Sequence, residues 1–189
     1  TPGFRPHPSR EQEGQYAFPG ANELIHARLK ADTKPKGHFP TPDEWLSQLH
    51  AEVVLCFFGF KSSFEGTREA ERFKKELDAY VKHLKSKPFG RNTPKIVLIS
   101  PTAVEAIEGI TSGKAQNRNL RIYTQSMSEV AAANKILFID CFAPSLNWYQ
   151  NGNRYTIDGA LYNDHGYKKL GEFLADSIFP DKKPTDSLK

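Results

Sequence analysis

The sequence has little cysteine and no long apolar run. Its 189 residues hold two cysteines, Cys56 and Cys141, and the longest apolar run, Val53 to Phe60, spans eight residues and contains Gly59. Two cysteines are too few for a disulfide-dense scaffold, and a helix that crosses a bilayer needs about 20 apolar residues. A hydrophobic share of 38% is too high for a disordered chain. We therefore expect one globular domain that does not span a membrane.

Methionine is also scarce. The only one is Met127, residue 1 is Thr, and no basic segment followed by an apolar stretch resembles a signal peptide. These features suggest a processed or truncated product, and they leave the compartment unknown.

The excess of positive charge is small and local. The formal net charge is +4, and residues 61–95 alone hold ten Lys and Arg against five Asp and Glu. This region includes a predicted helix, Thr67 to Lys87, whose apolar residues recur at helical spacing and leave the basic side chains on the opposite side. A solvated helix face explains this pattern, because aromatic residues do not alternate with the basic ones as in a nucleic-acid site. Nucleic acid is therefore not an expected partner.

Composition divides the chain into three parts. Residues 1–52 are rich in proline and contain one clear helical pattern, from about Asn22 to Ala31, and a second helix start at Thr41, where Thr precedes Pro and two acids. Residues 53–180 alternate apolar strands with amphipathic helices, and residues 181–189 form a tail. We expect the middle part to be the folded domain.

The alternation predicts the fold class. The expected strands are Val53 to Phe60, Lys95 to Ser100 and Ile136 to Phe142, and the further helices are Asn119 to Asn134 and Asn163 to Phe179. Apolar strands joined by helices form a parallel sheet with helices on both faces, a three-layer α/β architecture of the flavodoxin-like type. Ligands in such sheets bind beyond the carboxyl ends of the strands. The loops at residues 59–63, 100–102, 142–145 and 157–167 should therefore converge.

Several short motifs, in this order, resemble the SGNH or GDSL-type hydrolase family, and are closest to a divergent branch in multidomain proteins of planctomycete-like bacteria. They are Phe57-Phe58-Gly59-Phe60, Ser63-Phe64-Glu65-Gly66, Val97-Leu98-Ile99-Ser100-Pro101, and Asp158-Gly159 followed by Asn163-Asp164-His165-Gly166-Tyr167. The resemblance implies an esterase and deacetylase fold. Its chemistry uses a Ser nucleophile in a Gly-Asp-Ser motif, a His base oriented by an Asp, and Gly and Asn donors for the oxyanion.

The sequence departs from the family at each catalytic motif. Gly-Asp-Ser occurs nowhere, and no strand-like segment precedes Val53, so we expect this chain to lack the N-terminal strand or strands of the family. Lys61 stands at the position of the oxyanion-hole Asn. Asp158 matches the Asp of the late motif, but Leu161 stands where the family has its His. We therefore expect ordinary triad chemistry to be lost.

Other residues have both functional and structural interpretations. His165 is a candidate base or a surface residue at a helix start, and Asp158 is a residual catalytic acid or a turn residue. Ser62 and Ser63 suit a nucleophile at a strand-to-helix turn, but serines at such positions more commonly cap a helix, and Asn163 is predicted to cap the helix that follows it. Cys56 and Cys141 could pair only if their strands are neighbours. No metal site and no cofactor are expected, because His and Cys lack paired ligand spacing and no phosphate-binding Gly loop is present.

Three functions remain open. The first is a catalytically degenerate domain that acts as a ligand-binding or assembly module, for which the pocket residues would be Gly59, Lys61, Ser62, Ser63, Leu161 and Asn163. The positive charge of Lys61, at the end of the Val53 strand, would favour a small anionic ligand, and a sugar-like ligand is also possible. The second is an active esterase or deacetylase of carbohydrate or lipid esters whose Ser lies upstream of residue 1. The third is a structural subunit that docks on another protein chain or fused domains through the open edge of the Val53 strand. Export from a bacterial cell is implied by the resemblance alone.

Overall fold

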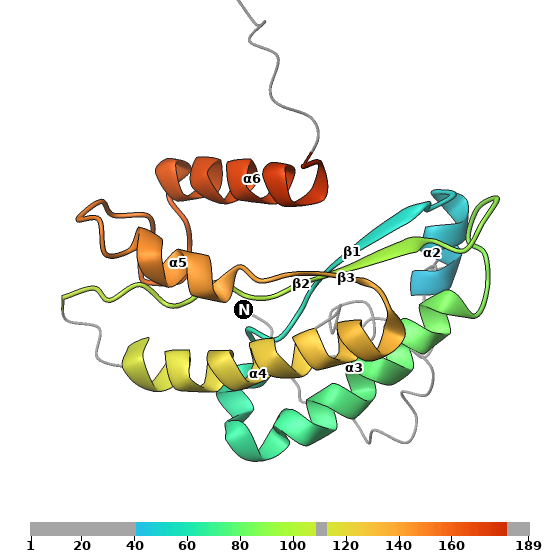
Figure 1. The fold of residues 1–189 in the computed structure, drawn as a ribbon, viewed down its shortest axis with the longest axis horizontal. Coiled ribbons are helices and arrows are strands. Elements are labelled where there is room, and N and C mark those ends of the chain that lie inside the picture. Colours follow the sequence, from blue (N-terminus) through green and yellow to red (C-terminus); the bar gives the residue numbers. More distant parts are fainter. Residues whose placement is uncertain (1–40, 109–112, 181–189) are drawn as a thin grey trace, which may run out of the picture.

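The fold is built on a three-stranded parallel sheet. In the computed structural model, residues 41–108 and 113–180 are described (Figure 1). The strands are β1 (Val53–Phe57), β2 (Lys95–Ile99) and β3 (Leu137–Ile139), in the order β1-β2-β3. Leu55 is in register with Val97, and Ile99 with Ile139. The central strand β2 is therefore paired on both sides, and β1 is an edge strand among the described residues.

Helices lie on both sides of this sheet. Figure 1 shows α3 and α4 on one side and α6 on the other, with α5 beyond the carboxyl ends of the strands. The architecture confirms the predicted three-layer α/β class. The helices are α2 (Pro42–Gln48), α3 (Ala70–Lys85), α4 (Gly113–Asn134), α5 (Phe142–Trp148) and α6 (Asp164–Ile178), with the short 3-10 turns η3 (Ser62–Glu65) and η4 (Thr67–Glu69) between β1 and α3.

The larger core lies between the sheet and the pair of helices α3 and α4. Alternate strand residues such as Cys56, Ile96 and Leu98 point to this side, because successive side chains of a strand face opposite ways. They meet the apolar side of α3, whose buried residues are Ala70, Phe73, Leu77, Tyr80, Val81 and Leu84. This spacing matches the helical pattern predicted from the sequence.

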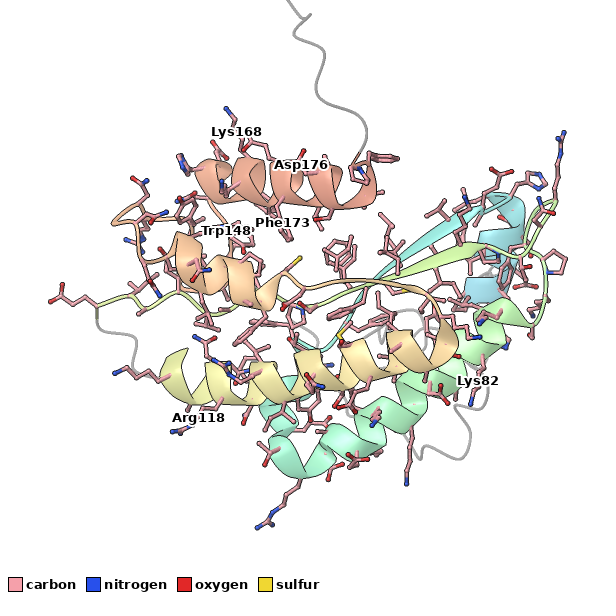
Figure 2. All side chains as sticks on the ribbon, in the orientation of Figure 1. Lys82, Arg118, Trp148, Lys168, Phe173 and Asp176 are labelled. Carbon is pink, nitrogen blue, oxygen red and sulfur yellow. The ribbon has the colours of Figure 1, made fainter. Side chains whose placement is uncertain are left out.

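A second, smaller core lies under α6. Val97, Ile99 and Ile139 are buried against the apolar side of this helix, which is formed by Leu170, Phe173, Leu174 and Ile178. Phe173 also packs on Trp148 of α5 with 5.6 Å between ring centroids, and Lys168 points away from the sheet into solvent (Figure 2). Helix α6 therefore joins the sheet to the segment that carries α5.

The strands are shorter than the sequence predicts. The apolar run Val53 to Phe60 ends as a strand at Phe57, because Gly59 adopts φ +96 and turns the chain out of the sheet. The third strand covers only Leu137–Ile139 within the predicted range Ile136 to Phe142. Both differences lie at the carboxyl ends of strands, where the chain turns toward the candidate site.

Two helices differ from the prediction. Helix α4 begins at Gly113, six residues before the predicted start at Asn119. Helix α5 occupies residues expected to form a loop, because Pro144 is compatible with the first turn of a helix. The carboxylate of Asp140 accepts hydrogen bonds from the N–H groups of Phe142 (2.8 Å) and Ala143 (3.2 Å), which satisfies the start of this helix.

Two helix starts agree with the prediction. Thr41 and Glu44 form a capping box at the start of α2, with the Thr41 hydroxyl accepting from the Glu44 N–H and the Glu44 carboxylate accepting from the Thr41 N–H. Asn163 caps α6 by accepting from the N–H of Gly166 at 2.9 Å. The predicted helix over residues 22–31 and the tail at 181–189 lie outside the described residues.

The two cysteines do not pair. Cys56 lies in β1, and Cys141 follows β3, so β2 separates the two strands. Both thiols are free and buried. None of the helices in the described part of the chain is long and apolar enough to cross a membrane.

Candidate functional site

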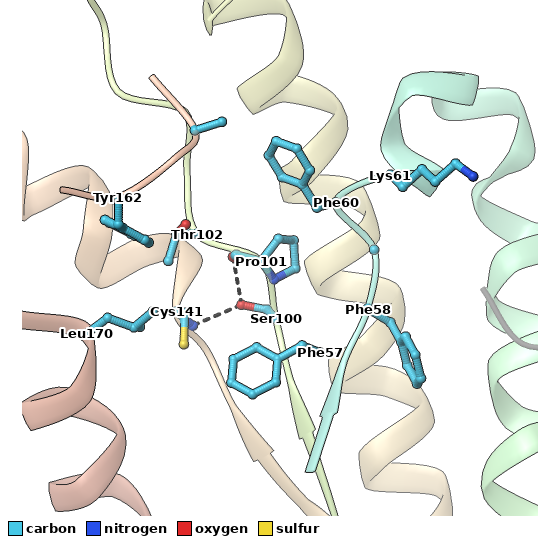
Figure 3. A pocket seen from close by; sticks show the side chains of 12 residues that line it. Phe57, Phe58, Phe60, Lys61, Ser100, Pro101, Thr102, Cys141, Tyr162 and Leu170 are labelled. Carbon is cyan, nitrogen blue, oxygen red and sulfur yellow. Dashed lines mark hydrogen bonds between the residues drawn. The ribbon is translucent and has the colours of Figure 1, made fainter. Parts of the chain in front are cut away.

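A pocket of about 360 Å³ lies beyond the carboxyl ends of the three strands (Figure 3). Its lining comes from the segments that follow β1, β2 and β3 and from the segment before α6, so these parts of the chain converge as expected for a parallel sheet. The lining residues are Phe57, Phe58, Gly59, Phe60, Lys61, Ser100, Pro101, Thr102, Cys141, Ala160, Tyr162 and Leu170. Four of these twelve are aromatic, and the site is mainly apolar with a few polar groups.

Gly59 sets the wall on the β1 side. A Cβ at this position would lie 3.3 Å from the sulfur of Met127, and its φ of +96 strains any other residue. The glycine therefore allows the chain to turn tightly over α4 and to direct Phe60 toward the pocket.

Ser100, at the end of β2, has a hydroxyl that is already engaged. Its Oγ accepts hydrogen bonds from the N–H groups of Cys141 (2.9 Å) and Phe142 (3.2 Å), and it donates to the carbonyl of Pro101 or the carboxylate of Asp140. The side chain is 1% exposed. Ser100 therefore links the start of α5 to the end of β2, and its proton is donated to a backbone carbonyl or to Asp140.

Cys141 lines the pocket as a neutral thiol. Burial, with a further contribution from the nearby charge of Asp140, raises the pKa of Cys141 to about 12. The thiolate is the reactive form of cysteine, and its population at neutral pH is negligible with such a pKa. Cys141 is therefore a small apolar side chain of the pocket wall and not a nucleophile.

The polar part of the pocket is a small group of hydroxyls. The Tyr149 and Tyr162 oxygens lie 3.2 Å apart, and the Tyr149 hydroxyl donates to the carbonyl of Ala103 at 3.0 Å. Burial raises the pKa of both tyrosines, and side-chain hydrogen bonds with Thr102 partly offset this effect. Because the Tyr149 proton is donated to Ala103, the Tyr162 hydroxyl donates to the Tyr149 oxygen. The Tyr162 oxygen and the neutral Thr102 hydroxyl can still accept a hydrogen bond at one end of an aromatic pocket.

The segment that supplies Ala160 and Tyr162 is held by a buried carboxylate. Glu105 is 6% exposed, and its side chain accepts hydrogen bonds from the N–H groups of Tyr155 (3.2 Å) and Thr156 (2.7 Å) and from the Thr156 hydroxyl. The Glu105 N–H donates to the carbonyl of Gly159 at 2.8 Å. Sequence reasoning missed this residue, although a single acid in the apolar stretch Ala103 to Ile107 was a usable signal.

The predicted serines are not arranged as nucleophiles. Ser63 is fully buried, donates to the carbonyl of Phe60 at 2.6 Å and accepts from the side chain of Gln116. The Ser63 carbonyl accepts from the side chain of Asn119, so this residue fixes η3 on α4. Ser62 is partly exposed in the same turn, and neither serine lines the pocket.

Asp158 and Leu161 lie in an exposed turn. The Asp158 carboxylate accepts from the N–H groups of Leu161 (2.7 Å) and Ala160 (2.9 Å), and these hydrogen bonds lower its pKa. Leu161, at the position where the resemblance places the His, is 52% exposed. Neither side chain lines the pocket, so Asp158 acts here as a turn residue.

His165 and Asn163 belong to the start of α6. The His165 ring is exposed and lies 5.1 Å from the ring of Tyr155, and it is not part of the pocket lining. Asn163 caps the helix through its side-chain oxygen and donates from its side-chain nitrogen to the carbonyl of Arg154. Of the predicted site residues, Gly59 and Lys61 line the pocket, and Figure 3 shows the Lys61 side chain extending from the rim away from Tyr162.

The described lining of the pocket offers apolar contacts, hydroxyl groups and the Lys61 ammonium. Among the twelve lining residues there is no His, Asp or Glu that could accept a proton from a hydroxyl. Within residues 41–108 and 113–180, no cluster of three or more His, Cys, Asp or Glu side chains could hold a metal ion. Among the described residues, the pocket lining does not bring a nucleophile and a base together.

Comparison with known proteins gives similarity at the level of structure. No protein-family model and no curated protein sequence matches the chain. A lipase/acylhydrolase from Enterococcus faecalis superposes with a TM-score of 0.51 at 20% identity, covering 72% of this chain and 65% of that protein. A variant acetyl-xylooligosaccharide esterase from Geobacillus superposes with a TM-score of 0.58 at 16% identity, and the match covers 87% of this chain and 69% of that protein. A carbohydrate acetylesterase from Sinorhizobium meliloti superposes with a TM-score of 0.51 at 15% identity, and the match covers 77% of this chain and 71% of that protein.

These similarities agree on one architecture. The matched structures are lipases, acylhydrolases and acetylesterases, and the chain spans less than two thirds of the length of the Enterococcus protein. At such low identity they establish the fold and not the activity. The described part of the chain has an SGNH/GDSL hydrolase-like fold, as the sequence motifs suggested.

Proposed function

We propose that this hydrolase-like domain is catalytically degenerate and binds a small, neutral, acetylated or other sugar-like molecule in the pocket at the carboxyl ends of the strands. The observation that carries the proposal is the composition of that pocket, which offers aromatic walls and neutral hydroxyls without a base beside a nucleophile. Its volume of about 360 Å³ falls within the range of roughly 300 to 1,000 Å³ that is usual for small-molecule sites.

The aromatic walls favour a ligand with flat C–H faces or an acyl group. Phe57, Phe60 and Tyr162 provide apolar surface, and Thr102 and Tyr162 provide hydroxyl oxygens that can accept a hydrogen bond from a sugar hydroxyl. The Lys61 ammonium points away from this interior, so an anionic group is not required for binding. The acetylated xylo-oligosaccharide named for the Geobacillus esterase is a suitable first probe of this ligand class.

The proposed loss of catalysis is supported by the contacts of the buried candidate nucleophiles. Ser63 and Ser100 are buried and hydrogen-bonded to the chain around them, and Cys141 is a neutral thiol. A hydroxyl needs an adjacent base before it attacks a carbonyl. The candidate base His165 is exposed at the start of α6 and does not line the pocket.

Binding is tested by calorimetric titration of acetylated xylobiose against the wild type and Phe60→Ala. We expect measurable binding to the wild type and a Kd about tenfold higher for Phe60→Ala, because loss of a ring contact costs on the order of 1 kcal/mol. Phe179→Ala is the matched control, since Phe179 is exposed at the end of α6 and does not line the pocket. Absence of binding, or equal weakening by both substitutions, contradicts the binding proposal.

Activity is tested separately with p-nitrophenyl acetate and a fluorophosphonate probe. We expect no acetyl release above the buffer rate and no labelled serine in this chain. Labelling of Ser62, Ser63 or Ser100 would show that the domain is an active esterase, whatever the titration gives. Applying the same probe to the full translated gene product tests the alternative of a serine outside these 189 residues.

A further inference from the structure

Exposed aromatic side chains gather at the pocket. Among the described residues, the exposed aromatic side chains are Trp45, Phe57, Phe64, Tyr167 and Phe179. Phe57 lines the pocket, and Phe64 and Tyr167 each lie against an aromatic ring that lines it. Apolar surface that remains in water beside a pocket is typical of a surface that contacts a ligand or partner.

Phe64 continues the wall that Phe60 forms on the β1 side of the pocket. The two ring centroids lie 5.5 Å apart with an interplanar angle of 72°, which is an edge-to-face contact. Phe60 is partly buried and lines the pocket, whereas Phe64 in η3 is 64% exposed. Because Ser63 fixes η3 on α4, the Phe64 ring is presented from a fixed turn. The aromatic surface on this side therefore extends from the pocket to solvent.

Tyr167 continues the opposite wall in the same way. Its ring centroid lies 5.7 Å from that of Tyr162, with an interplanar angle of 59°. Tyr162 is 8% exposed and lines the pocket, whereas Tyr167 in the first turn of α6 is 58% exposed. Figure 3 shows Phe60 and Tyr162 on opposite sides of Thr102. Each side of the pocket therefore has an inner ring and an outer ring.

The charges beside the two outer rings balance. Each outer ring is flanked in the sequence by exposed residues of opposite charge, which are Lys61 and Glu65 around Phe64, and Asp164 and Lys168 around Tyr167. A polyanion such as a nucleic acid binds where Lys and Arg side chains cluster. The surroundings of the outer rings therefore favour an uncharged ligand.

We propose that Phe64 and Tyr167 are sugar-binding platforms on the two sides of the pocket, and that the ligand is a neutral oligosaccharide. Its central units enter the pocket, and its outer units stack on the two platforms. A sugar ring has apolar C–H faces that pack on an aromatic ring, while its hydroxyls stay in water. The inference rests on the proposed function, because it makes the pocket ligand part of a longer chain.

The test compares a short and a long ligand of the same chemistry. Xylobiose and xylotetraose, each with one acetyl group, are titrated calorimetrically against the full 189-residue chain. We expect the Kd of the xylotetraose to be at least about tenfold lower, because the longer chain gains contacts with two aromatic rings outside the pocket.

Substitution of the platforms should affect the long ligand alone. Phe64→Ala and Tyr167→Ala should each raise the Kd of the xylotetraose about fivefold and leave that of the xylobiose unchanged. The double variant should bind both ligands equally. Phe64→Tyr and Tyr167→Phe keep a ring at each position and should preserve the preference for the longer chain.

Trp45→Ala is the matched control for the loss of an exposed ring. Trp45 is 45% exposed in α2, which precedes β1, and it does not line the pocket beyond the carboxyl ends of the strands. It should change neither Kd. Circular dichroism confirms that each variant is folded.

Several outcomes overturn the proposal. Equal Kd values for the two ligands in the wild type would remove the platforms and leave the pocket proposal standing, whereas no binding of either ligand would remove both. A preference for xylotetraose that persists in the double variant would place the longer chain elsewhere. Tighter binding of tetragalacturonic acid than of xylotetraose would exclude the neutral class. Dimerisation in light scattering that the double variant abolishes would assign the rings to a contact between two copies of the chain.

Discussion

Gly166, in the first turn of α6, has no room for a side chain. A Cβ there would lie 2.2 Å from the carbonyl oxygen of Tyr155 and 2.2 Å from the ring of Tyr162. The glycine thus lets α6 begin directly against the segment that forms one side of the pocket. Gly171, one and a half turns later on the same helix, has no neighbouring atom within 4 Å of its ideal Cβ.

These two glycines give a matched pair of substitutions. Gly166→Ala should lower the free energy of unfolding by about 3 kcal/mol, because the methyl group must displace backbone atoms. Gly171→Ala should raise it by about 0.5 to 1 kcal/mol, since alanine is the better helix former. Urea unfolding followed by circular dichroism measures both, and equal effects would show that α6 does not pack as described.

The buried thiols give a prediction at alkaline pH. Burial raises the pKa values of Cys56 and Cys141 to about 12, from a usual value near 9.0. Between these values the unfolded thiols are ionised while the native ones keep their protons, so the free energy of unfolding should fall as the pH rises above about 9. Urea titrations between about pH 8 and about pH 10 measure the slope, which should be shallower in the variant with Cys56→Ala and Cys141→Ala. The same slope in both proteins would contradict the assignment.

At the scale of elements, Glu105 joins two loops that the sheet does not connect. It lies after β2, and its carboxylate accepts from the backbone of Tyr155 and Thr156 in the segment before α6. Tyr155 and Thr156 are 4% and 1% exposed, so water cannot replace the carboxylate readily. The position of Tyr162 in the pocket therefore depends on a contact between two segments outside the sheet.

Removal of this carboxylate should loosen the segment. Glu105→Ala leaves two buried N–H groups without an acceptor, and we expect a loss of about 3 kcal/mol in the free energy of unfolding. Glu108→Ala is the control, because Glu108 is exposed three residues later. Thermal and urea unfolding measure the difference, and a change below that of the control would show that Glu105 does not hold the segment.

Across the whole molecule, resistance to local opening should decrease from β2 toward β1. The central strand is paired on both sides, and Ile96, Val97, Leu98 and Ile99 are all buried. Among the described residues, β1 is paired on one side only, so alternate N–H groups of this strand point away from the sheet. Local opening is easier where backbone groups are exposed.

Hydrogen exchange measures this gradient. We expect the amides of β2 to exchange most slowly and the outward amides of β1 to exchange at least about tenfold faster. Equal protection of both strands would mean that a strand from outside the described residues pairs with β1.

The sequence predicted most elements of the fold for identifiable reasons. Apolar spacing located α3, and the Thr41 and Asn163 caps located the starts of α2 and α6. Helix α5 was missed because its start is stabilised by Asp140 and its proline suggested a loop. The strand ends were placed too late, because an apolar run does not show where a glycine turns the chain.

The candidate site was harder to predict. Sequence motifs identified Gly59 and the loops that converge on the pocket, but the resemblance directed attention to Asp158, Leu161 and His165, whose side chains do not line it. Glu105 contacts Tyr155, and Tyr149 contacts Ala103, across more than about 40 residues of sequence. Tyr162 joins this group through its contact with Tyr149. Such contacts leave no periodic signal in a sequence.

The sequence by itself determined the α/β class, the order of strands and helices and the absence of a Gly-Asp-Ser motif, because these depend on local spacing and residue identity. Only the tertiary structure decided which hydroxyls are hydrogen-bonded to the backbone, that both thiols are buried and which face of β1 is half exposed. Burial and hydrogen-bond partners are properties of neighbours in space, and the chain acquires those neighbours only when the strands and helices pack together.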